Sequence, residues 1–154
     1  MTDEDALSLV AYCGLYCGLC AERARVPSMA GRLQETLKEE GYDSFYQFVP
    51  DIKDGYPQFM QLLDRFAKME CGCRSGKGGP PDCAMRECAK RRKLEACPMC
   101  DEYPCAKIES FAGTYPTLIQ DGRRMKKVGI KKWVEEQEIR AKRGFVYSDS
   151  KYES

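Results

Sequence analysis

Residues 97–105 read Cys97-Pro98-Met99-Cys100-Asp101-Glu102-Tyr103-Pro104-Cys105 and bring three cysteines close together. Two cysteines separated by two residues can hold one metal ion, because the turn between them directs backbone amides at both sulfurs. Pro98 fixes that turn, and Cys105 stands where the next helix should begin, a position that favours a thiolate. The stretch therefore predicts a fold whose loops are clamped by a metal ion.

The other cysteines form similar short groups. The N-terminal stretch Cys13-Gly14-Leu15-Tyr16-Cys17-Gly18-Leu19-Cys20 ends on the same two-residue spacing, and Cys71-Gly72-Cys73 follows later. The chain contains no histidine, so a zinc site must use thiolates, with or without a carboxylate. We predict metal binding by all ten cysteines, with zinc as the metal and an iron–sulfur cluster as the alternative. They are Cys13, Cys17, Cys20, Cys71, Cys73, Cys83, Cys88, Cys97, Cys100 and Cys105.

Ten thiolates would fill two four-thiolate sites and leave two over. We expect the first site to take its ligands from the C-terminal group, as Cys97, Cys100 and Cys105 with either Cys83 or Cys88. The second should contain two or three of Cys13, Cys17 and Cys20, closed by Cys71 or Cys73. This arrangement predicts about two zinc ions per chain.

Length and composition are those of one small globular domain. The chain has 154 residues, of which 43% are hydrophobic and 32% charged, and no apolar run approaches the roughly 20 residues that span a bilayer. The first residues are acidic where a secretory signal would be basic, so metal thiolates in the cytoplasm are favoured over disulfides. We expect a single domain over residues 1–154, no membrane association, and a flexible tail at 145–154.

Helical spacing of apolar residues dominates the sequence, and few stretches alternate as strands do. We therefore predict a mainly α fold with metal-clamped loops. An apolar stripe that includes Phe59, Leu62, Leu63 and Phe66 is expected to pack in the core. The predicted helices cover residues 28–40, 57–69, 85–94, 103–111, 117–128 and 130–143.

Charge is distributed unevenly along the chain. Residues 1–70 carry 7 Lys/Arg against 12 Asp/Glu, a net charge of −5, whereas residues 71–154 carry 18 against 12, a net charge of +6. The basic excess is concentrated in residues 86–93 and 123–143. It predicts either attraction to nucleic acid or an acidic partner, or simply a solvated helix face.

The sequence lacks the patterns of the common enzyme classes. Without histidine, Ser-His and Cys-His catalysis are excluded. The glycine-rich loop at 76–81 has neither the strand nor the helix start of a phosphate-binding loop. The N-terminal spacing matches the cluster motif of radical S-adenosylmethionine enzymes, but 154 residues are too few for their barrel. A binding module is therefore favoured, with a protein partner, over a redox protein or an enzyme using acids such as Asp82, Asp101 or Glu102.

Three motifs together resemble a known family. They are the stretch from Ala11 to Cys20, the stretch Cys83-Ala84-Met85-Arg86-Glu87-Cys88-Ala89, and residues 97–105. In this order they resemble the cysteine-rich domain of unknown function 3795 family of bacteria and archaea, over residues 8–137. The resemblance implies zinc binding without an established reaction. This chain differs in carrying Tyr16 in place of an aspartate and in lacking a cysteine shortly before Cys83.

Overall fold

The computed structural model describes residues 1–74 and 79–151. Contacts divide the chain into two compact units, Met1–Cys20 with Cys71–Ser154 (the cysteine unit) and Ala21–Glu70 (the hairpin unit). The single domain expected from the length therefore contains two compact units. Residues 75–78 of the glycine-rich loop, for which we predicted no nucleotide site, lie outside the described residues, as do residues 152–154 of the expected tail.

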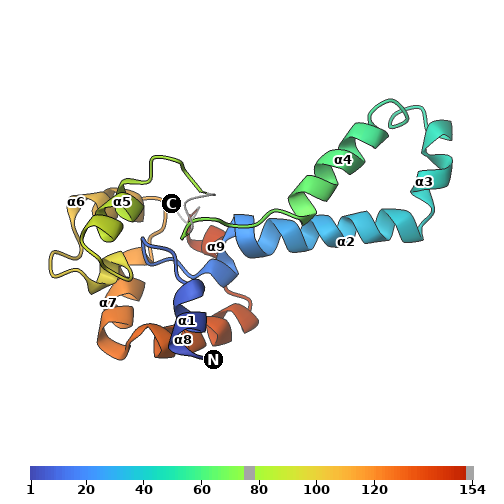
Figure 1. Ribbon diagram of the computed structural model, residues 1–154. Coiled ribbons are helices and arrows are strands. Elements are labelled where there is room, and N and C mark those ends of the chain that lie inside the picture. The colour runs from blue at the N-terminus through green and yellow to red at the C-terminus, as the bar shows by residue number, and fades with distance from the viewer. Residues whose placement is uncertain (75–78, 152–154) are drawn as a thin grey trace. The chain divides into compact units, whose positions relative to one another are not determined.

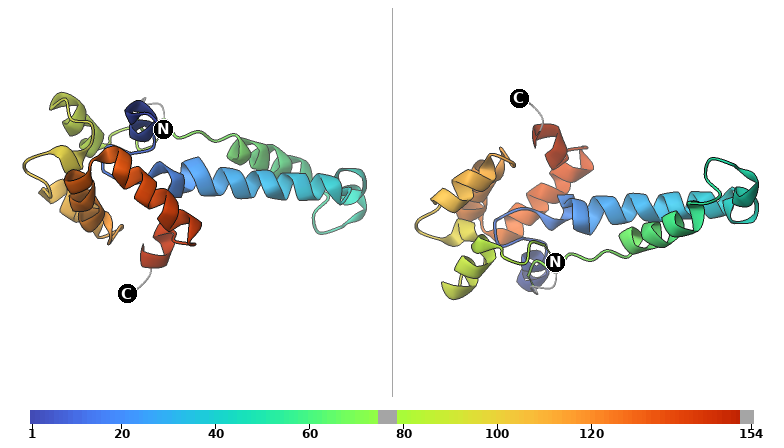
Figure 2. Two further views of the ribbon diagram at one scale, coloured as in Figure 1. Left: turned by 90° about the horizontal axis from the view of Figure 1, so that it is seen from below. Right: turned by 90° about the horizontal axis from the view of Figure 1, so that it is seen from above.

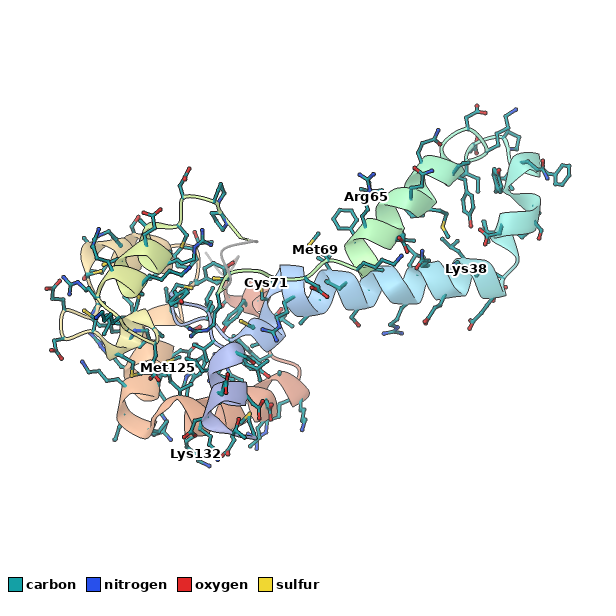
Figure 3. All side chains as sticks on the ribbon, in the orientation of Figure 1. Lys38, Arg65, Met69, Cys71, Met125 and Lys132 are labelled. Carbon is teal, nitrogen blue, oxygen red and sulfur yellow. The ribbon has the colours of Figure 1, made fainter. Side chains whose placement is uncertain are left out.

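The cysteine unit is built from helices around one apolar core (Figure 1). Its core contains the fully buried side chains of Trp133, Val134, Met125 and Val10. Met125 points into the unit, whereas Lys132 lies on its surface (Figure 3). The helices are α1 (Asp3–Ser8), α5 (Ala84–Arg91), α6 (Ala106–Ala112), α7 (Leu118–Val128), α8 (Ile130–Lys142) and α9 (Tyr147–Lys151).

Two single-turn 3-10 helices, η1 (Cys17–Leu19) and η4 (Cys97–Met99), interrupt the loops of this unit. The prediction of a mainly α fold is confirmed, because within residues 1–74 and 79–151 extended pairing is limited to one bridge between Val10 and Tyr16. Among the same residues, no helix combines the length and the apolar character that crossing a bilayer requires.

The predicted helices of the cysteine unit are present, with shifts of up to three residues at their ends. On α8, Trp133, Val134 and Gln137 are buried, as their helical spacing predicted. The expected tail, however, contains α9 in its described part. Tyr147 of α9 is 5% exposed and its hydroxyl accepts a hydrogen bond from the Tyr16 backbone N–H at 2.8 Å, so this residue belongs to the core.

The hairpin unit pairs helix α2 (Val26–Glu39) with helix α4 (Tyr56–Ala67), which lie side by side (Figures 1 and 2). The chain turns between them through Gly41, α3 (Tyr42–Phe45) and η3 (Tyr46–Phe48). Gly41 has φ +78°, the left-handed conformation that glycine adopts at helix ends. Both helices were predicted, and residues 21–25 add a short π-helical segment, η2 (Ala21–Arg25), before α2.

The apolar stripe on α4 was expected in the core, and this prediction was wrong for most of it. Leu63 is buried, but Phe59, Leu62 and Phe66 are exposed. The physical reason is the close approach of α2, where a Cβ built on Gly31 would lie 4.0 Å from Cβ of Ala67. Contact through small residues covers only a narrow strip of α4 and leaves the rest of its apolar surface open.

Candidate metal centre

The two Cys-x2-Cys segments fold into matching turns. In η4 the backbone N–H of Cys100 donates to the Cys97 carbonyl at 2.9 Å, and in η1 that of Cys20 donates to the Cys17 carbonyl at 3.1 Å. Cys100 and Cys20 both follow in extended conformation, with ψ of 145° and 133°. Both sequence motifs thus produce the tight local geometry that lets two sulfurs approach one ion.

The N-terminal segment docks on the η4 turn. The Cys97 N–H donates to the Tyr12 carbonyl at 2.7 Å. Gly14 has φ +99°, and a Cβ placed on it would lie 2.9 Å from Cγ of Pro98. Glycine is therefore required here both for its backbone conformation and for the close approach of Pro98. These contacts join residues that lie more than 80 positions apart in the sequence.

Two helices position three further cysteines. Cys83 is the N-cap of α5, Cys88 lies within that helix, and Cys105 is the N-cap of α6, as its place after Pro104 predicted. Arg86 is 5% exposed and donates to the carbonyls of Pro80 and Pro81 at 3.0 and 2.7 Å. A buried arginine thus fixes the segment that leads into Cys83.

Four cysteines line one small cavity of about 70 Å³. They come from α5, from the η4 turn and from the start of α6, and they are Cys88, Cys97, Cys100 and Cys105. In the described part of the chain no three cysteine, aspartate or glutamate side chains are arranged so that they could hold a metal ion as they stand. The Cys97 thiol instead contacts the Met85 carbonyl at 3.9 Å. None of the ten cysteines, all of which are described, forms a disulfide.

The thiols influence one another electrostatically. Burial, reinforced by the nearby thiols of Cys105, Cys88, Cys100 and Cys83, raises the pKa of Cys97 to about 12. A charged sulfur is unfavourable in such surroundings because desolvation and like charges both oppose it. Cys97 therefore keeps its proton at neutral pH unless a cation compensates the charge.

Other thiols also influence Cys13 electrostatically. Burial raises the pKa of Cys13 to about 12, the hydrogen bond from the Leu15 backbone opposes this change, and Cys73, Cys97 and Cys83 reinforce it. Cys73, which we expected in the same site, lies within electrostatic reach of Cys13, as do Cys97 and Cys83, which the sequence did not predict for it. Cys17 and Cys20 stand on the η1 turn, and Cys71 precedes Cys73 by two residues.

Two arginines that the sequence analysis did not single out organise the centre. Arg92, the C-cap of α5, donates to the Cys100 sulfur at 3.2 Å and to both Glu102 carboxylate oxygens at 2.9 Å. It brings positive charge to the side of the cavity where a thiolate would lie. The sequence could have indicated this role of Arg92, because the residue lies in the last turn of a helix, one turn after Cys88.

Arg74 acts on the other side, directly after Cys73. Its guanidinium donates to the carbonyls of Val10 and Glu95 at 2.6 and 2.8 Å and lies 4.7 Å from the ring centre of Tyr12. These contacts hold the segment after Cys73 against the N-terminal segment and against the segment that precedes Cys97. Nothing in the local sequence indicates them, because all three partners lie more than 20 residues away.

The basic region at 123–143 is partly neutralised. Of its nine basic residues, four are paired with carboxylates. The pairs are Arg124 with Glu136, Lys126 with Asp101, Lys132 with Glu135, and Arg140 with Asp121. Paired charges attract phosphates less strongly, so the charge excess read from the sequence overstates the basic surface.

Comparison with known proteins gives one match. A family model described as "Protein of unknown function (DUF3795)" matches residues 9–110, more than half of the chain. The matched segment contains the hairpin unit and all ten cysteines. No curated protein and no solved structure matches the chain.

Proposed function

This chain belongs to the DUF3795 family of proteins of unknown function, and we propose that it is a zinc-binding interaction module. The observation that carries the proposal is the small cavity lined by Cys88, Cys97, Cys100 and Cys105. These four residues include the three that the sequence assigned to one site, with Cys88 as the fourth.

The donor set suits zinc. Zinc takes four thiolates in a tetrahedral arrangement with sulfurs about 2.3 Å from the metal, and such a site leaves no position open for a substrate. Its chemistry is therefore structural. Bound here, the ion would connect α5, the η4 turn and α6.

Charge balance supports the same assignment. Four thiolates around Zn²⁺ carry a formal excess of two negative charges, which the hydrogen bond from Arg92 to Cys100 would partly offset. Metal binding also displaces the thiol proton that burial holds on Cys97. The cavity therefore favours a cation over four free thiolates.

We propose a second zinc ion beside Cys13, with Cys73 and Cys83 as further ligands. These residues lie close enough for the charges of Cys73 and Cys83 to act on Cys13. Arg74 and the contact of Gly14 with Pro98 hold their segments together. The remaining ligand would come from Cys71 or from the η1 turn, so the chain would bind about two ions.

The partner proposed for the module is a protein in the cytoplasm. Zinc bound by thiolates is stable in a reducing compartment, and the absence of disulfides among the ten described cysteines supports this location. Nucleic acid is less favoured, because four of the nine basic residues at 123–143 are paired with carboxylates.

Elemental analysis with an absorption spectrum tests this proposal on anaerobically purified protein. We expect a colourless protein with about two zinc ions per chain, and about one after Cys105→Ser. The control Ser110→Ala, an exposed position on the same helix α6, should keep both ions. A brown protein with iron and acid-labile sulfide would instead support the redox alternative, and a metal-free protein with paired cysteines would exclude both.

A further inference from the structure

The hairpin unit contains none of the ten cysteines and exposes large apolar side chains. Met29 is 65% exposed, and Leu33 45%, on α2. On α4, Phe59 is 44% exposed, Leu62 51% and Phe66 37%. Single exposed apolar residues are ordinary on protein surfaces, but five large ones on two adjacent helices form a patch that calls for an explanation.

Helical periodicity places the five side chains on one side of the hairpin. Met29 and Leu33 are four residues apart, and Phe59, Leu62 and Phe66 follow spacings of three and four, so each set forms one stripe. On each helix, the stripe is rotated in the same direction about the helix axis, away from the residues that contact the other helix. Because α2 and α4 run antiparallel, these equal rotations bring the two stripes to the same face of the hairpin. We call this surface the apolar face.

The other side of the hairpin is polar. Gln34 donates to Asp64 at 3.4 Å across the two helices, and a shallow hollow there is lined mainly by polar side chains that include Lys38, Gln61 and Arg65. Figure 3 labels Lys38 on α2 and Arg65 on α4. The unit is therefore amphipathic as a whole. Its polar side faces water, and its apolar face lacks a covering layer of its own.

The unit also has little core. Among its described residues, the buried apolar side chains are those of Ala30, Tyr56 and Leu63. Two helices packed through a narrow strip normally gain stability by burying their remaining apolar surface against another layer. A second pair of helices, as in a four-helix bundle, is the simplest layer of matching shape.

We propose that the apolar face pairs with the same face of a second copy of this chain to form a four-helix bundle. At about 200 Å² for each large apolar side chain, the exposed fractions give roughly 450–500 Å² of apolar surface per copy. A stable dimer buries about 800 Å² per partner, of which somewhat more than half is apolar. The apolar face alone supplies that share, and a two-fold axis lets one surface be its own partner.

Sedimentation equilibrium on the full-length, zinc-loaded protein tests the dimer. We expect a mass twice that of the 17.5 kDa chain for the wild type. Leu62→Glu should raise the dimer dissociation constant by at least about a hundredfold, because the symmetric interface receives two buried charges. The matched control Gln61→Glu, at the neighbouring exposed position of α4, should leave the dimer intact.

Two further measurements distinguish loss of the dimer from unfolding of the variant. Circular dichroism and zinc content should be unchanged in Leu62→Glu, and if this variant unfolds, Leu33→Lys on α2 replaces it. A wild type that stays monomeric at every concentration would overturn the proposal. A dimer that survives both Leu62→Glu and Leu33→Lys would also overturn it, as would a dimer that Gln61→Glu disrupts as much as Leu62→Glu does. Loss of zinc with an intact dimer would count against the metal sites and leave this interface standing.

Discussion

Replacement of Gly14 by alanine should loosen the joint between the N-terminal segment and the η4 turn. Gly14 has φ +99°, where an alanine costs about 1–2 kcal/mol. The new Cβ would also lie 2.9 Å from Cγ of Pro98, and relieving such crowding in a packed region costs about 1–3 kcal/mol more. We therefore expect the free energy of unfolding to fall by about 2–5 kcal/mol.

The matched control is Gly144→Ala. Gly144 has φ +94°, nearly the same backbone conformation, but no atom lies within 4 Å of the position that its Cβ would take. Urea unfolding followed by circular dichroism should show a loss of about 1–2 kcal/mol for this variant. Addition of Pro98→Ala to Gly14→Ala should recover part of the larger loss. Equal losses for Gly14→Ala and Gly144→Ala would refute the claim that Pro98 requires a glycine opposite it.

Two further predictions concern Arg92 and Tyr147, whose roles were found in the structure. Arg92→Gln removes the donor to the Cys100 sulfur and should lower zinc affinity roughly tenfold, as measured by chelator competition. The control Arg91→Gln should leave zinc affinity unchanged. Equal affinities of the two variants would contradict this role for Arg92. Tyr147→Phe leaves the Tyr16 N–H without its acceptor and should cost about 1–3 kcal/mol in urea unfolding. Burial raises the pKa of Tyr147 above its ordinary 10.0, so the stability linked to its proton is present below pH 10 and is lost as the pH rises beyond it. The variant should therefore lose less stability than the wild type above pH 10, and parallel pH profiles would argue against this.

Local patterns in the sequence predicted the parts of the fold that local physics determines. The long helices α2, α4, α7 and α8 follow from apolar spacing, and glycine ends α2 as predicted. Helix α1 was missed although Thr2 and Asp5 form a capping box, because six residues carry little periodicity. Helix α9 was missed because Tyr147 is held by the distant Tyr16, a contact that no local pattern encodes.

In the candidate site, too, the sequence predicted only what local geometry determines. The Cys-x2-Cys spacing predicted both tight turns, because three residues fix each of them. Which cysteines share a cavity depends on how helices pack, so the choice between Cys83 and Cys88 stayed open in the sequence. Packing places Cys88 at the cavity and brings Cys83 close to both Cys97 and Cys13. The charge pairs that neutralise much of 123–143 also depend on tertiary structure.

The exposed stripe on α4 shows a further limit of pattern reading. An apolar stripe predicts that a helix face is covered, but it does not say by what. Here α2 covers the strip around Leu63 and leaves Phe59 and Phe66 open. A core within the chain and an interface between chains cannot be distinguished from such a pattern, because both require the same residues.

Zinc K-edge X-ray absorption of the purified protein tests the metal assignment most directly, because it reports the identity and distance of the atoms around the metal. We predict a first shell of four sulfurs at about 2.3 Å, which Gly144→Ala should retain, and a lower total zinc content in Cys88→Ser. A first shell dominated by oxygen or nitrogen, or a zinc content that Cys88→Ser and Cys105→Ser both leave unchanged, would contradict it.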